Sequence, residues 1–444
     1  MEIKNNKKVI RGWAMYDWAN SAYNLVITST IFPAYYTAVT TTKEHADQVS
    51  FFGIRFVNTA LSNYALAAAY LVIVLLSPIL SSIADHRGNK KIYMQVFTWL
   101  GAMACCGLFY FRLETLEWGI ICFALAAIGY AGGFVFYNSY LPEIATLDQQ
   151  DAVSAKGFSY GYIGSVLLQV ICLLFVLKPD WFGITDASFP PRLSFLLVGL
   201  WWILFAQIPF FVLPKGSPNF NRAEQSRMPN GFVELKKVWM QVKQMVLLRK
   251  FLVAFFCYSM GVQTVMLVAA SFGSKILQLP TSSLIITILI IQLVAIAGAN
   301  LMSRLSNIYG NVQVLMSVVF IWVFICIGAY FIDTKAMFYV MAAVVGLVMG
   351  GIQSLSRSTY SKFIPEQTPD TASFFSFYDV TEKLAIVAGL VTFAYVEELT
   401  GSMRNSTLAL TIFFIAGLVF LLFLRKAERK SIAADAALTL KSLK

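Results

Sequence analysis

Long apolar runs recur along the whole sequence, each about 20 residues long and separated by short polar segments. A run of this length, folded as an α-helix, crosses the roughly 30 Å hydrocarbon layer of a bilayer. Of the 444 residues, 58% are hydrophobic and 13% charged, whereas about half and about a quarter are typical of soluble domains. A soluble core cannot bury this surplus, so the predicted fold class is an all-α integral membrane bundle.

The apolar runs predict twelve transmembrane helices. The first six are expected near residues 11–36, 58–84, 91–111, 117–141, 153–177 and 192–214. The second six are expected near residues 250–274, 283–305, 312–332, 335–361, 372–397 and 404–425. Lys and Arg are concentrated at both termini and in the even-numbered loops. The positive-inside rule then places both termini in the cytoplasm.

The net charge of +11 is explained by these short basic blocks, which flank apolar runs instead of lining one soluble face. We therefore predict the lipid bilayer, and no nucleic acid, as the large partner. Cysteines confined to apolar runs and two distant histidines predict neither a metal site nor a cofactor. Short loops without a large soluble insertion favour a bacterial inner membrane, and we expect a monomer.

The second half of the chain repeats features of the first. The loop at 81–91 resembles the segment 303–311, which lies half the chain length further on. A Pro-Glu pair at 142–143 recurs at 365–366, a register that differs from the first by a single position. Two matches at nearly one register indicate a duplication.

The duplication predicts two six-helix bundles, at 1–214 and 250–444, joined by a cytoplasmic linker at 215–249. Within the linker, residues 232–248 are a candidate amphipathic helix at the membrane surface, and a solvated tether is the alternative. The first half needs about 20 extra residues, which fit the loop at 37–57. Transporters commonly bind solute at the interface of such repeats and rock one half against the other.

The loop after the second predicted helix resembles the signature loop of the major facilitator superfamily. The resemblance rests on Asp85, Arg87 and Gly88 followed by two lysines, although Ser81 stands where the signature has a glycine. In that superfamily the loop braces helix 2 against helix 11, whose positive end favours a nearby acid. The resemblance thus implies a gating role for this loop. Glu143, at the inner end of the fourth helix, is a further gating candidate, or it only ends that helix.

Three segments, 13–23, 157–164 and 350–358, are similar to the vacuole-effluxer-like branch of that superfamily. The branch includes the fungal autophagy-related vacuolar amino-acid exporter and many bacterial members. The resemblance implies the major facilitator fold and a transport function. The chain departs from the branch at Tyr258, near which helix 7 usually has an Asp, and at Glu382, where a Gly usually precedes the helix 11 lysine. This departure suggests that the acidic group lies on helix 11.

The first predicted helix carries a polar stripe. Its members, spaced i, i+3, i+4 and i+7 and therefore on one face of an α-helix, are Asp17, Asn20, Ser21 and Asn24. Such a stripe lines a water-filled cavity that binds solute, or it hydrogen-bonds neighbouring helices. We favour the cavity, because a carboxylate is a costly packing element inside a membrane. The position of Asp17 near the cytoplasmic end also leaves a gating role open.

The eleventh predicted helix carries the densest ionisable cluster, Asp379, Glu382 and Lys383. Asp379 and Lys383 are four residues apart with the acid first, the favourable order for an intrahelical pair. Glu382 is then predicted to be the unpaired charge, which could pair with Arg357 or carry a proton during transport. The alternative is a closed network of these four residues without a transport role.

The tenth helix adds Gln353 and Arg357, one turn apart, and the seventh helix adds Gln263. Arg357 could hold a solute carboxylate through two hydrogen bonds while the amides bind an amino group. The alternative is that Arg357 snorkels to the membrane surface.

These residues predict secondary active transport of a small polar solute, such as an amino acid or a related organic ion, by alternating access. The expected coupling ion is a proton in preference to sodium. The sequence lacks a Gly-x-x-x-x-Gly-Lys-Ser/Thr phosphate loop, which argues against ATP-driven transport. No nucleophile and base stand at a recognisable spacing, so we do not expect an enzyme. The alternative function is a non-transporting membrane sensor or assembly protein that retains the fold.

Overall fold

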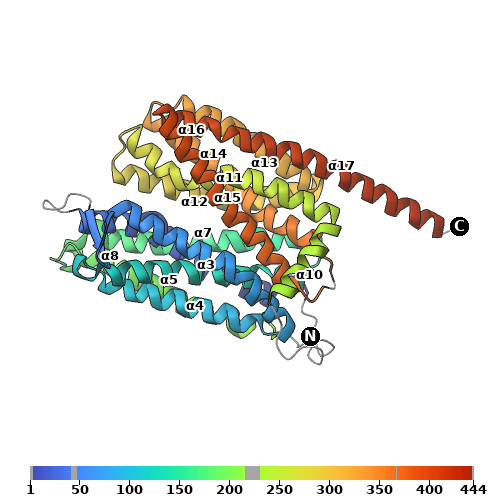
Figure 1. Ribbon diagram of the computed structural model, residues 1–444, viewed down its shortest axis with the longest axis horizontal. Coiled ribbons are helices and arrows are strands. Elements are labelled where there is room, and N and C mark those ends of the chain that lie inside the picture. The colour runs from blue at the N-terminus through green and yellow to red at the C-terminus, as the bar shows by residue number, and fades with distance from the viewer. Residues whose placement is uncertain (1–3, 42–47, 216–230, 367, 443–444) are drawn as a thin grey trace. The chain divides into compact units, whose positions relative to one another are not determined.

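The computed structural model describes residues 4–41, 48–215, 231–366 and 368–442, and the chain is largely helical (Figure 1). The α- and π-helices of the first half are α1 (Lys7–Ala22), the π-helix η1 (Tyr23–Ile31), α2 (Phe32–Thr40), α3 (Asn58–Arg87), α4 (Lys90–Gly107), α5 (Leu116–Asn138), the four-residue α6 (Leu141–Ile144), α7 (Gln150–Leu177) and α8 (Phe189–Val212). Three short 3-10 helices are η2 (Leu108–Tyr110), η3 (Leu113–Thr115) and η4 (Pro179–Phe182). The second half contains α10 (Gly231–Gln244), α11 (Val246–Lys275), α12 (Thr281–Tyr309), α13 (Asn311–Tyr330), α14 (Lys335–Phe363), α15 (Thr371–Thr400), α16 (Met403–Ala409) and α17 (Thr411–Ser442).

The twelve predicted membrane spans are confirmed, with ends within a few residues of those expected except in the last span, where α17 continues to Ser442, 17 residues beyond the expected end at 425. Among the described residues, ten helices are long and apolar enough to cross a membrane. The other two spans are the first, formed by α1, η1 and α2 in succession, and α15, which carries Asp379, Glu382 and Lys383. The first span differs from the single α-helix expected at 11–36, because its middle is a π-helix.

Helix ends follow local sequence signals. The side chain of Asn6 accepts a hydrogen bond from the backbone nitrogen of Lys8 at 2.9 Å and caps α1. Gly88 ends α3 with a φ of 64°, a left-handed conformation that glycine adopts without strain. Thr334 caps α14 by accepting from the nitrogen of Met337.

A β-hairpin at residues 48–57 forms the later part of the loop expected at 37–57. Strand β1 (Gln48–Phe51) pairs antiparallel with β2 (Ile54–Val57). Phe52 and Gly53, with φ values of 48° and 81°, form the two-residue turn between them. Positive φ at both turn residues matches the twist of a hairpin.

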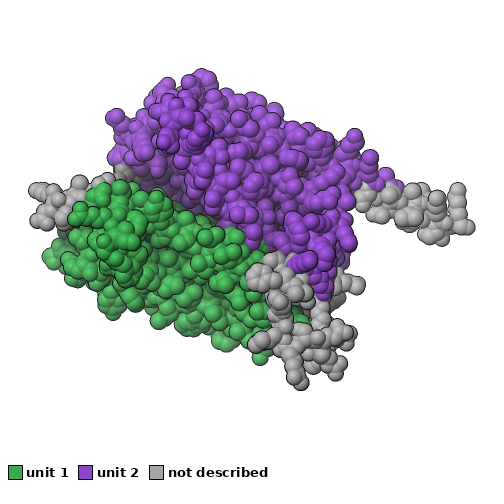
Figure 2. Space-filling view, viewed as in Figure 1, with its two compact units in different colours: residues 1–146, 156–231, 369–376 green, residues 147–155, 232–368, 377–444 purple. Residues whose placement is uncertain are grey.

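The chain divides into two compact units, coloured separately in Figure 2. Unit 1 comprises Met1–Thr146, Lys156–Gly231 and Pro369–Ser376. Unit 2 comprises Leu147–Ala155, Phe232–Thr368 and Phe377–Lys444. Residues 216–230 of the predicted linker lie outside the described residues. Its later part forms α10, in which Val238 and Val242 are buried whereas Lys236 and Lys243 are exposed.

In unit 1, α4 packs against α5 and α8, and α1 packs against α8. Gly129 of α5 lies directly against the backbone of Gly101 in α4, where a Cβ atom would not fit. Gly161 and Gly164 of α7 leave similar room for the side chain of Ser21 and the backbone of α1. Gly161 and Gly164 thus allow α1 and α7 to pack closely.

In unit 2, α12 and α14 form the most extensive helix pair, and α17 packs on α11 and α13. Gly346 and Gly350 of α14 lie against the carbonyl oxygens of Ile291 and Ala295 on α12. Gly298 of α12 lies against the backbone of α14 in the same way. Gly346 and Gly350 thus allow α12 and α14 to pack closely, and α14 is the helix that carries Arg357.

Candidate functional site

The polar stripe on the first span is divided by its backbone geometry. Asp17 and Asn20 are buried, with exposed fractions of 1% and 0%, whereas Asn24 is exposed. The prediction that Asn24 shares the environment of the other two was wrong. The reason is that α1 gives way to η1 at Tyr23, and the i→i+5 bonds of a π-helix change the angular spacing of side chains.

Asp17 is held by an aromatic cluster. The hydroxyl of Tyr137, at the end of α5, donates to Asp17 Oδ2 at 2.6 Å. This length is typical of an O–H group bonded to an ionised carboxylate. The ring of Tyr137 stacks on Trp13 and Tyr16, with centroids 4.4 Å and 4.9 Å away. Tyr137 was missed from the sequence, because nothing local marks a tyrosine 120 residues from its partner.

Asn20 is a buried amide without a local partner. Among the described residues, neither its side-chain oxygen nor its nitrogen has a hydrogen-bond partner. Each buried group left in this way costs about 1–3 kcal/mol. The Asn20 amide is therefore available to a bound molecule or to a different arrangement of the helix.

The predicted contact between the signature loop and the start of helix 11 forms inside unit 1. Asp85 Oδ1 accepts from the nitrogen of Ala372 at 3.1 Å, and Oδ2 accepts from the nitrogen and the hydroxyl of Ser373, both at 2.7 Å. The carboxylate thus binds free N–H groups at the positive end of α15. Of the other two signature residues, Gly88 ends α3 and Arg87 is exposed.

Glu143 does more than end a helix. It forms an ion pair with Lys90 at the start of α4, and the hydroxyl of Thr371 donates to it at 3.0 Å. Lys90 is buried, lies 4.1 Å from the ring centroid of Tyr140, and donates to the carbonyl oxygen of Ser139. Lys90 was not predicted as a site residue, because in the sequence it is only one of two lysines in a basic loop.

A second polar cluster, in unit 2, was missed from the sequence. Asp151, whose side chain is 0% exposed, accepts from Lys362 Nζ at 2.7 Å, Asn311 Nδ2 at 2.7 Å and Ser306 Oγ at 2.8 Å. Lys362 also donates to Asn311 Oδ1 at 3.0 Å, and Asn311 donates to Thr359 at 3.1 Å. All three donors to the carboxylate are therefore side chains. We call this the Asp151 cluster.

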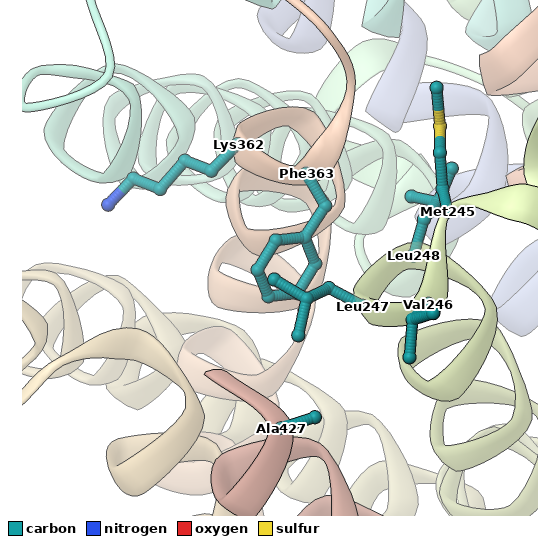
Figure 3. A pocket seen from close by; sticks show the side chains of 7 residues that line it. All are labelled: Met245, Val246, Leu247, Leu248, Lys362, Phe363 and Ala427. Carbon is teal, nitrogen blue, oxygen red and sulfur yellow. The ribbon is translucent and has the colours of Figure 1, made fainter. Parts of the chain in front are cut away.

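The repeat could have revealed the Asp151 cluster. Asp151 precedes Ser373 by half the chain length, the same register that relates Asp85 to Asn307. A cavity of about 620 Å³ borders the cluster at Ser306 and Lys362. Figure 3 shows a second cavity, of about 420 Å³, where Lys362 points away from the α11 residues on the other wall.

The ionisable cluster on α15 is confirmed in part. Lys383 Nζ lies 3.2 Å from Asp379 Oδ1, the predicted intrahelical pair, and 3.0 Å from Glu382 Oε2. Gln263 Nε2 of α11 donates to Glu382 Oε1 at 2.9 Å. The prediction that Glu382 is unpaired was wrong, because the long lysine side chain reaches both neighbouring acids. Two carboxylates therefore share one ammonium group.

Arg357 is buried, with 1% of its surface exposed, so the alternative that it snorkels to the surface was wrong. Its Nε donates to Ser154 Oγ at 3.0 Å and its Nη2 to the Ser154 carbonyl oxygen at 2.8 Å. Gln353 is half-buried on the same helix. Gln263 instead donates to Glu382, so the side-chain amides of Gln263 and Gln353 have different surroundings.

Comparison with known proteins identifies the family. The family model described as "Vacuole effluxer Atg22 like" matches residues 5–434. An uncharacterized MFS-type transporter of Bacillus subtilis, YxiO, is 31% identical over 95% of this chain and 96% of its own. Autophagy-related protein 22-1 of Emericella nidulans is 26% identical over 59% of this chain and 47% of its own length. The chain thus matches about half the length of that fungal protein.

Solved structures show the same fold at low sequence identity. The Escherichia coli fucose:proton symporter FucP superposes with a TM-score of 0.68 at 12% identity, covering 94% of this chain and 97% of its own. The proton:xylose symporter XylE superposes with a TM-score of 0.69 at 13% identity, covering 94% and 95%. The chain therefore belongs to the Atg22-like vacuole effluxer family, within the major facilitator superfamily of multi-pass membrane transporters.

Proposed function

We propose that this protein is a proton-coupled secondary transporter of a small polar solute, of the amino-acid or related organic-ion class, that works by alternating access. It acts as a monomer in a bacterial inner membrane with both termini in the cytoplasm. The Lys and Arg distribution supports this orientation. The word "effluxer" in the family description supports a transport function.

The observation that carries the proposal is the surplus carboxylate on α15. Asp379 and Glu382 share the ammonium group of Lys383, so two negative charges face one positive charge within this cluster. A charge at membrane depth costs at least about 2.5 kcal/mol, and a bound proton removes that cost. Glu382, whose side chain is 24% exposed against 6% for Asp379, is the better proton acceptor by access.

Asp17 supplies the second candidate for coupling. It lies on the first span, in unit 1, and Tyr137 fixes its orientation. The neighbouring Asn20 amide offers one donor and one acceptor to a solute. On α14, Arg357 is the candidate for the solute's carboxylate and Gln353 is the candidate for its amino group. The contacts of Asp85 and Glu143 at the start of α15 have the gating role.

Reconstitution into liposomes tests this function. A metabolite-wide uptake screen first identifies a solute, and its accumulation is then driven by an imposed pH gradient. In Glu382→Gln we expect gradient-driven accumulation to fall to the level without a gradient, while solute exchange across the membrane continues. The reason is that the amide keeps the size of the side chain but cannot release a proton.

Glu397→Gln is the matched control. Glu397 lies on the same helix, is about one-third exposed, and contacts Lys275 only at 3.7 Å. Its substitution should leave accumulation unchanged. Unchanged accumulation in both Glu382→Gln and Asp17→Asn would refute proton coupling through these sites. A complete absence of flux in the wild type would favour a sensor or assembly protein.

A further inference from the structure

The first span contains a long π-helix. Residues Tyr23–Ile31, nine in number, form η1 between two α-helices. π-Helices occur mostly as single turns and are frequent at functional sites. Elsewhere in the described residues the helical turns are α or 3-10. A segment of this length needs a local cause.

The fold itself does not require the π-helix. Tyr16 and Tyr258 are equivalent in the two copies once the longer loop of the first half is allowed for. The Tyr16 hydroxyl lies against Gly133, and the Tyr258 hydroxyl bonds Ser356 at 2.7 Å. Gly133 and Ser356 are related by the same register as the two Pro-Glu pairs, which supports the equivalence of the tyrosines. Aligned on the tyrosines, η1 corresponds to residues 265–273, which lie in the unbroken α-helix α11.

One contact distinguishes the first copy. Thr30 Oγ1 lies 2.8 Å from the carbonyl oxygen of Leu25, 3.0 Å from that of Val26 and 2.8 Å from Gln169 Oε1 on α7. A hydroxyl has one hydrogen and cannot donate to three oxygens. Gln169 is fully buried, and its nitrogen has no partner among the described residues. Turning the amide over lets Gln169 Nε2 donate to Thr30, while Thr30 donates to the main chain.

This arrangement suits a widened turn. The Thr30 hydroxyl reaches the carbonyl five residues back, and Ser29 Oγ reaches the carbonyl of Asn24, also five residues back, at 2.8 Å. Side-chain hydroxyls that bond to nearby carbonyls compete with the regular helix pattern. At the positions equivalent to Thr30 and Gln169, the second copy has Phe272 and Val391, which cannot form these hydrogen bonds.

We propose that Gln169 and Thr30 form a clasp that holds the first span in the π register, and that its release rewinds residues 23–31 to an α-helix. When the π turn loses its one extra residue, the part of the span before it moves by one residue position relative to the part after it. This is a shift of about 1.5 Å along the axis and a rotation of about 100°. Asp17 and Asn20 then change direction relative to α2. Gln169 is thus a positioning residue for the candidate site. The claim concerns the helix register and holds whether or not transport is proton-coupled.

Structures of Thr30→Val and Gln169→Met in lipid nanodiscs test the clasp. We expect i→i+4 hydrogen bonds over residues 23–31 in both variants and a retained π-helix in Thr30→Ser, which keeps the hydroxyl. Thr392→Val is the matched control, because Thr392 bonds only within its own helix, to Ala388 at 2.8 Å. A π-helix that persists in both Thr30→Val and Gln169→Met overturns the proposal.

Amide hydrogen exchange gives a second measurement if a variant does not yield a structure. Exchange over residues 23–31 should change about fivefold between wild type and Thr30→Val, the effect of one ordinary hydrogen bond on an equilibrium. Thr30→Ser should restore the wild-type rate, and Thr392→Val should match it. Equal exchange in wild type and Thr30→Val would also overturn the clasp.

Discussion

The two units make a similar contact between a helix end and a helix start, with the acid at the helix end in unit 1 and at the helix start in unit 2. In unit 1, Asp85 lies at the end of α3 and binds Ser373 at the start of α15. In unit 2, Asp151 lies at the start of α7, at the position equivalent to Ser373, and binds Ser306 at the end of α12, one residue before Asn307, the equivalent of Asp85. Both carboxylates lie beside a helix N-terminus, that of α15 for Asp85 and that of α7 for Asp151, where negative charge is favourable. Each unit thus has a serine hydroxyl that donates to a carboxylate at a helix N-terminus. The acid comes from the end of a helix in unit 1 and from the start of a helix in unit 2.

The two contacts differ in what holds the carboxylate. Asp85 accepts from two backbone nitrogens, which no side-chain substitution removes. Asp151 accepts from three side chains, one of them the ammonium group of Lys362. Single substitutions can therefore remove each donor to Asp151 in turn, whereas side-chain truncations leave the two backbone donors to Asp85 in place.

The largest expected effect is that of Lys362→Met. The substitution leaves the fully buried Asp151 carboxylate without its counter-ion, which should lower the free energy of unfolding by about 4 kcal/mol. Denaturant titration in detergent micelles measures it. Lys335→Met, at the exposed start of the same helix, should change stability by less than about 0.5 kcal/mol. Equal effects of Lys362→Met and Lys335→Met would contradict the dependence of the Asp151 carboxylate on its side-chain donors.

Substitutions around Asp85 should have intermediate effects. Asp85→Asn weakens hydrogen bonds to a charged group and should cost about 2 kcal/mol, whereas Ser373→Ala keeps the backbone donors and should cost about 1 kcal/mol. The double variant Asp85→Ser with Ser373→Asp moves the acid to the helix start, as in unit 2. It should be more stable than the sum of its single substitutions by about 1 kcal/mol. Additive costs in this cycle would contradict the equivalence of the two contacts.

The smallest expected difference compares two tyrosines. Tyr137→Phe removes a hydrogen bond to a carboxylate and should cost about 2 kcal/mol, whereas Tyr258→Phe removes one to the Ser356 hydroxyl and should cost about 1 kcal/mol. The same denaturant titration resolves them. A Tyr258→Phe cost above that of Tyr137→Phe would argue against an ionised Asp17.

The sequence predicted what depends on nearby residues. Membrane spans follow from the length and apolarity of single segments, and the Asp379 to Lys383 pair follows from the helix repeat. The Asp85 contact was accessible only through the family resemblance. The error at Glu382 came from assigning Lys383 a single partner, although its side chain reaches two acids.

Contacts between distant segments were missed, because tertiary packing decides them. Asp151 and Lys362 are 211 residues apart, and Asp17 and Tyr137 are 120 apart. Of these residues, only Asp151 could have been predicted from the sequence, because the repeat register relates it to Ser373. The π-helix had no detectable signal in the sequence. The contact that we infer to hold it joins residues 139 positions apart.

The composition of unit 1 has a consequence for synthesis. Its segment Pro369–Ser376 comes from near the end of the chain, and the backbone donors to Asp85 follow it by 287 and 288 residues. At about 5 to 20 residues per second, a ribosome needs about 15 to 60 s to make that stretch. Throughout this interval the nascent Asp85 carboxylate must be hydrated or held by the insertion machinery. The first bundle to enter the membrane therefore closes only when translation is almost complete.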